Sequence, residues 1–130
     1  MSFKFEKLEV WKEAVRLTSK IYKIIADFPR GEIFGLTNQL RRASVSVALN
    51  IAEGSTGRTD KDFRSYLLRS LGSIHEVVTG LYVALEQNYL KTETFEELYS
   101  DYDRLSKRVN ALIKSFNNKL STVDSGRRTE

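Results

Sequence analysis

Few residues of this chain are of the types that carry out chemistry. His75 is the single histidine and there is no cysteine, which excludes disulfides, thiolate metal sites and cysteine nucleophiles. Glu93, Glu97 and Asp101 recur every fourth position and could bind a cation, but no other segment supplies a matching Glu-x-x-His pair. A solvated acidic start of a helix explains them better, and His75 is expected on a helix surface. Because a nucleophile-elbow motif is also missing, we predict no enzyme activity, no catalytic or metal-binding residue and no cofactor.

A second candidate for chemistry is the glycine-rich segment Gly54-Ser55-Thr56-Gly57-Arg58. A Gly-x-x-Gly loop clamps the RNA backbone in KH domains, but a KH domain also needs strands that this chain lacks. The loop leads into three cations that alternate with two aspartates: Arg58, Asp60, Lys61, Asp62 and Arg64. One interpretation is a solvated helix end in which Asp60 pairs with Arg64. The other is a phosphate-binding surface, for which Arg58, Lys61 and Arg64 are our candidate nucleic-acid-binding residues.

The elements that position these residues are helical throughout. Apolar residues recur at intervals of three and four and predict helices over about 7–27, 36–53, 60–88 and 92–120. Proline disfavours helix in the residue before it, so Pro29 ends the first helix, and Gly54 is predicted to cap the second in the left-handed conformation. Residues 44–51 alternate like a strand, but no other segment could pair with them. The apolar face expected to pack inward in the first helix is Leu8, Trp11, Val15, Thr18, Ile21, Tyr22 and Ile25.

Four helices of similar length with short joints predict an all-α, antiparallel up-down-up-down four-helix bundle. We assign the bundle to residues 1–120 and a disordered tail to residues 121–130, which have nothing to pack. Small residues in the third helix predict a close contact with small residues of the second, because each glycine costs about 1 kcal/mol of helix propensity. They are Ser70, Gly72, Ser73 and Gly80. The alternative is that these glycines merely weaken an exposed helix.

The second helix has two apolar faces. One face suits the chain's own core and consists of Leu36, Leu40, Ala43, Val47 and Ile51. The other consists of Val45, Ala48, Leu49 and Ala52. Because a surface helix of a lone domain needs one apolar stripe, we assign this second face to the interface of a homo-oligomer.

A polar stripe separates the two faces and contains Arg42, Ser46, Asn50 and Glu53. It is either a binding groove or an internal network in which Arg42 pairs with Glu76 and Asn50 bonds across helices. Since buried polar groups need partners and such networks fix helix register, we predict a structural polar network of Arg42, Asn50, Glu53 and Glu76. Arg41 points toward the second apolar face and is our fourth candidate for nucleic-acid contact.

Composition sets the broad class. The chain has 130 residues, and 21 basic against 17 acidic side chains give a net charge of +4 and a pI near 9.4. This surplus permits an anionic partner without requiring one. The first residues lack the apolar run of a signal peptide, and nowhere do 18 apolar residues follow one another. We therefore expect a cytoplasmic protein with no membrane partner.

Several short motifs, in their order and spacing, resemble the bacterial four-helix-bundle proteins first noted in intervening sequences of 23S ribosomal RNA genes. The resemblance covers residues 5–120 and is carried by Leu8-x-x-Trp11, Phe28-Pro29, Gly35-Leu36-Thr37, Gln39-Leu40-Arg41-Arg42-Ala43, Asn50-Ile51-Ala52-Glu53-Gly54 and Leu71-Gly72-Ser73. One departure is Ala48, where the family often has proline. The fold is also similar to the accessory variability protein of diversity-generating retroelements, a ring-like pentamer that associates with a reverse transcriptase and nucleic acid.

The resemblance implies a homo-oligomer, by similarity a pentamer, with RNA, DNA or a nucleic-acid enzyme such as a reverse transcriptase as partner. Together with the residues above, it predicts a non-enzymatic scaffold that binds nucleic acid or a nucleoprotein through a basic surface. The alternative is an interaction adaptor that binds only protein. A steep fall of nucleic-acid affinity with salt would distinguish the first from the second.

Overall fold

The computed structural model describes the backbone of residues 2–129 and the side chains of residues 2–117. This part of the chain is helical and contains no strand. Its elements are η1 (Lys4–Lys7), α1 (Glu9–Ile25), η2 (Arg30–Glu32), α2 (Leu36–Ser55), α3 (Asp60–Glu86) and α4 (Thr92–Thr129). The predicted all-α class and the four long helices are confirmed, and residues 44–51 are helical despite their alternation.

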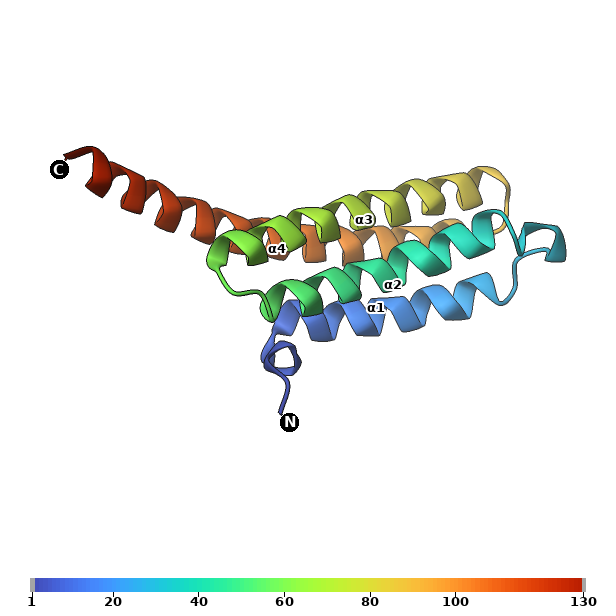
Figure 1. Ribbon diagram of the computed structural model, residues 1–130. Coiled ribbons are helices and arrows are strands. Elements are labelled where there is room, and N and C mark those ends of the chain that lie inside the picture. Colours follow the sequence, from blue (N-terminus) through green and yellow to red (C-terminus); the bar gives the residue numbers. More distant parts are fainter. Residues whose placement is uncertain (1, 130) are drawn as a thin grey trace.

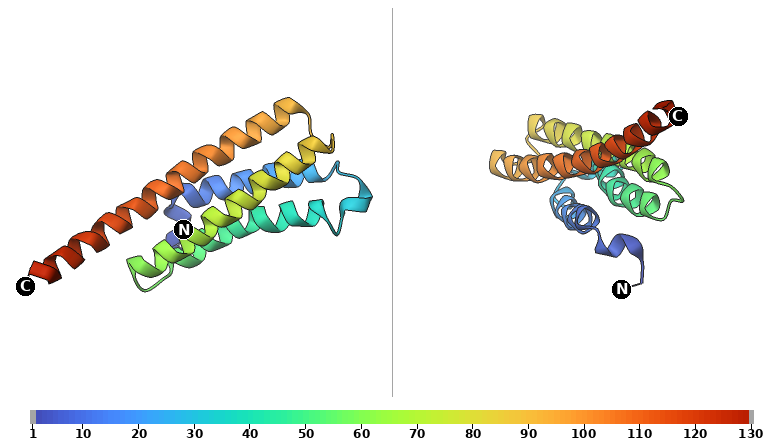
Figure 2. Two further views of the ribbon diagram at one scale, coloured as in Figure 1. Left: turned by 90° about the horizontal axis from the view of Figure 1, so that it is seen from above. Right: turned by 90° about the vertical axis from the view of Figure 1, so that its left-hand side faces the viewer.

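The four long helices lie side by side, and the connections between them lie at alternating ends of the molecule (Figure 1). α2 packs against both α1 and α3, α3 packs against α4, and the contact between α1 and α4 is thinner. α4 projects past the other helices at the end that carries the α2–α3 loop (Figures 1 and 2). The helix thus continues over residues 121–129. The side chains of residues 121–130 and the backbone of residue 130 lie outside the described residues. The disorder of this tail stays a prediction.

The ends of α2 and α3 follow local hydrogen bonding. Thr59 caps α3, and its hydroxyl accepts from the Asp62 amide at 3.1 Å. The predicted left-handed cap at Gly54 is wrong, because α2 continues to Ser55 and no described glycine has a positive φ. The reason is that the hydroxyls of Ser55 and Thr56 donate to the carbonyls of Ala52 and Glu53, each at 2.8 Å. These hydroxyls satisfy carbonyl groups at the helix end that a left-handed glycine would otherwise satisfy.

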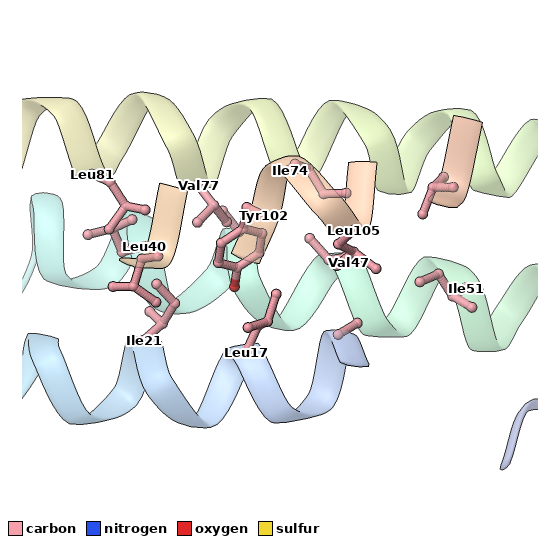
Figure 3. Close-up of a cluster of buried hydrophobic side chains, with 14 of the residues drawn as sticks. Leu17, Ile21, Leu40, Val47, Ile51, Ile74, Val77, Leu81, Tyr102 and Leu105 are labelled. Atoms are coloured by element: carbon pink, nitrogen blue, oxygen red, sulfur yellow. The ribbon is translucent and has the colours of Figure 1, made fainter. Parts of the chain in front are cut away.

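The core lies between the inward faces of all four helices, and Figure 3 shows its central layer. Tyr102 of α4 lies there among Leu17 of α1, Val47 of α2 and Val77 of α3, and all four are fully buried. The core face of α2 is as predicted, except that Leu36 is only half-buried. That of α1 is corrected: its buried apolar residues are Val10, Ala14, Leu17, Ile21 and Ile25.

Two adjacent apolar rows on α1 explain this error. Val15 and Tyr22, which we expected inside, are exposed, and Trp11 is half-buried. Both rows have the spacing of a helix face, so periodicity alone does not tell which one meets α2. The row that contains Trp11, Val15 and Tyr22 is consequently part of the molecular surface.

The close contact between α2 and α3 is confirmed. A Cβ added at Gly80 would lie 2.7 Å from Leu40 Cδ2, and one added at Gly54 would lie 2.7 Å from Tyr66 Cβ. The Ser70 hydroxyl donates to the Val47 carbonyl at 2.9 Å, so a small side chain here also bonds across the contact. Gly72 is different, since nothing lies within 4 Å of an added Cβ.

Candidate interaction surfaces

A groove of about 320 Å³ runs along α1, α2 and η1, and we call it the apolar groove. Its lining residues are Phe5, Trp11, Val15, Thr18, Val45, Ala48, Leu49 and Ala52. η1 holds the ring of Phe5 4.8 Å from the ring of Trp11, and Leu49 is 62% exposed. All four residues that the sequence assigns to an oligomer interface therefore lie in one groove. Their assignment to an interface stays a prediction.

Sequence reasoning missed the other wall of this groove. Phe5, Trp11 and Val15 come from the N-terminal segment and from α1. The available signal was the excess of apolar residues on α1, which carries more of them than one core stripe requires. The second apolar face of α2 is therefore half of a larger apolar surface.

A second hollow, of about 620 Å³, adjoins the apolar groove and shares Val45 and Leu49 with it. We call it the polar cleft, because its lining also includes Tyr22, Asn38, Arg41, Arg42, Ser46 and Glu76. Arg41 donates through Nη2 to Asn38 Oδ1 at 2.6 Å. Arg41 thus lies beside the second apolar face, as the helical geometry predicts.

The predicted polar network of Arg42, Asn50, Glu53 and Glu76 does not form inside this chain. Arg42, Glu53 and Glu76 are exposed, and no ion pair joins Arg42 to Glu76 in the part of the chain that the structure describes. Both line the polar cleft instead. Their long side chains reach solvent from the edge of the α2–α3 contact, so they gain no partner from burial.

Short side chains make the polar contacts of this region. Asn50 donates through Nδ2 to the carbonyl and the hydroxyl of Ser46, at 2.9 and 3.0 Å. The hydroxyls of Ser46 and Ser73 lie 2.9 Å apart and link α2 to α3. Asn50 therefore bonds within α2, and Ser46 makes the side-chain contact with α3.

The cations that follow the glycine-rich loop form what we call the basic end, made of Arg58, Lys61 and Arg64. Arg58 and Lys61 are exposed, whereas Arg64 is half-buried and donates through Nε to Asn117 Oδ1 of α4. Arg41 lies fourteen residues before Ser55, where α2 ends, about 21 Å along the helix. The structure thus brings three of the four candidate nucleic-acid-binding residues together and leaves Arg41 in the polar cleft.

Two acidic residues of α4, Glu97 and Asp101, pair with a lysine of α1. Lys20 lies 2.9 Å from Glu97 and 2.8 Å from Asp101, and these hydrogen bonds, that to Asp101 first, raise the pKa of Lys20. Buried Glu13 of α1 meets two arginines of α4, Arg108 at 2.7 Å and Arg104 at 3.4 Å. The sequence did not indicate this α1–α4 ion-pair seam, which supplies partners for two of the three acidic residues considered above.

Other features bear on the possible classes of site. His75 is exposed, as expected. Within the described residues no group of three or more acidic, histidine or cysteine side chains is arranged to hold a metal ion. In the same part of the chain, no helix combines the length and apolar character that crossing a membrane requires. The candidate surfaces are therefore the apolar groove, the polar cleft and the basic end.

The chain belongs to the family described as 23S rRNA-intervening sequence protein, which matches residues 6–111. Among curated proteins, none matches the chain. A solved structure at 1.70 Å resolution, of a protein of unknown function from the S23 ribosomal protein family of Bacteroides thetaiotaomicron VPI-5482, has a TM-score of 0.76. The two sequences are 21% identical, and the match covers 81% of this chain and 98% of that one. At this identity the likeness shows the fold alone.

Proposed function

We propose that this family member is a non-enzymatic scaffold, built as an antiparallel up-down-up-down bundle that assembles into a closed homo-oligomer. The oligomer binds RNA, DNA or a nucleoprotein partner through its basic surface. The observation that carries the proposal is the apolar groove, in which Leu49 is 62% exposed beside Val15, Val45 and half-buried Trp11. Contiguous apolar surface of this kind is typical of protein interfaces.

Burial of the groove supplies the driving force for assembly. Fully burying one leucine side chain is worth about 1.5–3 kcal/mol, and Leu49 lies at the border of the apolar groove and the polar cleft. A neighbouring chain seated there would also cover Arg42 and Glu76. By similarity to the accessory variability protein of retroelements, the closed oligomer is a pentamer.

Symmetry then multiplies the basic end. Between Glu53 and Arg69 the chain has four basic and three acidic residues, so one copy carries a weak surplus. Cyclic symmetry places the same end of every copy on one face of the ring. Repeated clusters of Arg58, Lys61 and Arg64 then add to a positive face that attracts phosphates. By the same resemblance, a nucleic-acid enzyme such as a reverse transcriptase is a candidate partner.

Assembly is tested by comparing Leu49→Asp with Leu68→Asp in light scattering. Both leucines are exposed, 62% and 42%, but Leu68 lies on α3 outside the groove. We expect the wild type and Leu68→Asp to be oligomeric at micromolar concentration and Leu49→Asp to be a folded monomer. A wild-type monomer, or equal masses for the two variants, would overturn the assigned interface.

Nucleic-acid binding is tested with the variant that changes Arg58, Lys61 and Arg64 to glutamine. The matched control changes three exposed cations near the α1–α2 and α3–α4 connections: Lys23 in the last turn of α1, Arg30 in η2 and Lys91 between α3 and α4. These two connections lie at the end of the bundle opposite the α2–α3 loop (Figure 1). We expect mixed-sequence single-stranded RNA and duplex DNA to bind wild type and control alike. For the first variant, affinity should fall and the salt slope should flatten by up to about three ions per chain.

Two results would reject the basic end as the binding surface. One is equal affinity of the two triple variants at moderate salt. The other is no nucleic-acid binding by any of the three proteins, combined with salt-insensitive binding of a protein partner. That second result favours the protein-only adaptor.

A further inference from the structure

An exposed aromatic cluster lies where α3 ends and α4 begins, at the end of the bundle opposite the basic end. Its rings belong to Tyr82, Phe95 and Tyr99, with centroids 4.8 Å apart for Tyr82–Phe95, 5.9 Å for Phe95–Tyr99 and 6.2 Å for Tyr82–Tyr99. Phe95 is buried, but Tyr82 and Tyr99 are 49% and 40% exposed. We call this cluster the tyrosine surface. The rings of Tyr82 and Tyr99 are exposed to solvent, and both pack against the buried ring of Phe95.

A groove continues from the tyrosine surface along the seam between α3 and α4. Its volume is about 290 Å³, and Tyr99 lines it together with Ile74, Val78, His75 and Asp103. From Tyr99 to Ser106 the groove follows α4 for about 10 Å. This length suits about three residues of an extended peptide, and the tyrosine surface adds room for more.

The charge of this region is opposite to that of the whole chain. Residues 79–103 contain six acidic residues and one lysine, whereas the chain as a whole has a net charge of +4. Within the described residues, Glu86, Glu93 and Glu96 are exposed and have no ion-pair partner. Glu86 lies one helical turn after Tyr82, and Glu96 lies one turn before Tyr99. Carboxylates therefore flank both exposed rings along the helices.

We propose that the tyrosine surface and its groove bind an extended, arginine-containing segment of a partner protein. A guanidinium that stacks on a tyrosine ring gains a cation–π contact, and its edge can donate to a neighbouring carboxylate. Glu86 and Glu96 supply that carboxylate beside the rings of Tyr82 and Tyr99. An apolar side chain between two arginines of the segment enters the groove at Ile74 and Val78.

The same charges exclude nucleic acid as the occupant. Tyrosine rings can stack on bases, but the phosphates that accompany the bases would approach three unpaired glutamates and be repelled. The site is distinct from the basic end and goes beyond the proposed function. It gives the scaffold an acidic docking surface for a basic protein, separate from the surface proposed for nucleic acid.

The test uses the full chain and a fluorescein-labelled peptide of sequence Gly-Arg-Leu-Arg-Gly, measured by fluorescence anisotropy at low salt. The comparison peptide has glutamate in place of arginine. We expect the arginine peptide alone to bind, with Tyr82→Leu/Tyr99→Leu weakening it about tenfold and Glu86→Gln/Glu96→Gln weakening it similarly. Phe34→Leu, at an exposed aromatic residue between η2 and α2, is the control and should bind as wild type does. Leucine keeps the apolar bulk, and circular dichroism checks the fold.

Four results would overturn the proposal. They are no binding of the arginine peptide to wild type, equal binding by the Tyr82/Tyr99 variant, an equal loss in Phe34→Leu, and binding of single-stranded RNA in place of the peptide that the Tyr82/Tyr99 variant loses. The triple variant of Arg58, Lys61 and Arg64 separates this site from the proposed function. That variant should keep full peptide affinity whether or not it binds nucleic acid.

Discussion

Replacing Gly54 and Gly72 by alanine should change stability in opposite directions, although both glycines lie within helices. Helix propensity alone predicts that each change raises the free energy of unfolding by up to about 1 kcal/mol. At Gly72 nothing lies within 4 Å of the added Cβ, so we expect the gain of about 0.5–1 kcal/mol in full.

At Gly54 packing outweighs propensity. The added Cβ would lie 2.7 Å from Tyr66 Cβ, 3.0 Å from Phe63 Cδ1 and 3.3 Å from the Phe63 carbonyl oxygen. Carbon atoms in contact prefer about 3.5–4.0 Å, so the overlap with Tyr66 is about 1 Å. Tyr66 Cβ is fixed to the backbone of α3, and only a shift of α3 away from α2 relieves the overlap. Overpacking of this kind costs about 1–3 kcal/mol, which leaves a net loss of up to about 2 kcal/mol.

The assay is urea unfolding followed by circular dichroism, with all proteins at one concentration because the stability of an oligomer depends on concentration. We expect the midpoint of Gly72→Ala above that of wild type and the midpoint of Gly54→Ala below it. Equal midpoints for the two variants would refute the argument, since propensity without packing predicts that outcome.

Three further predictions concern polar groups. Tyr102→Phe should raise stability by about 1 kcal/mol at neutral pH, because the buried hydroxyl has no hydrogen-bond partner among the described residues. Burial raises the pKa of Tyr102, so above about pH 10 the unfolded chain ionises first. Wild type should therefore lose stability as pH rises there, and the phenylalanine variant should lose less in the same urea titrations. Glu13→Gln should cost about 1–2 kcal/mol, because the buried carboxylate loses two arginine contacts, while exposed Glu9→Gln should stay within about 0.5 kcal/mol. Glu53→Ala should also stay within about 0.5 kcal/mol, since its side chain is exposed; a loss of several kcal/mol would restore the predicted buried network.

Helical periodicity predicts which residues of one helix share a surface, but it does not predict which residues of different helices do. Val45, Ala48, Leu49 and Ala52 could be grouped from the sequence because they lie on one helix, where spacing fixes which residues share a face. Their partners Phe5 and Trp11 could not be grouped with them, because that contact depends on how η1 and α1 pack. The tyrosine surface was missed for the same reason, since Tyr82 and Tyr99 belong to different helices.

The sequence by itself determined the four helical segments, the core face of α2 apart from Leu36, and the close contact at Gly80. All of these follow from local spacing and from residue size. Tertiary structure decided which of two apolar rows of α1 faces inward, that Arg42 and Glu76 are exposed, and that Glu13 meets two arginines of α4. These outcomes depend on the rotation of each helix about its axis. Contacts between helices set that rotation, and residues far apart in the chain make those contacts.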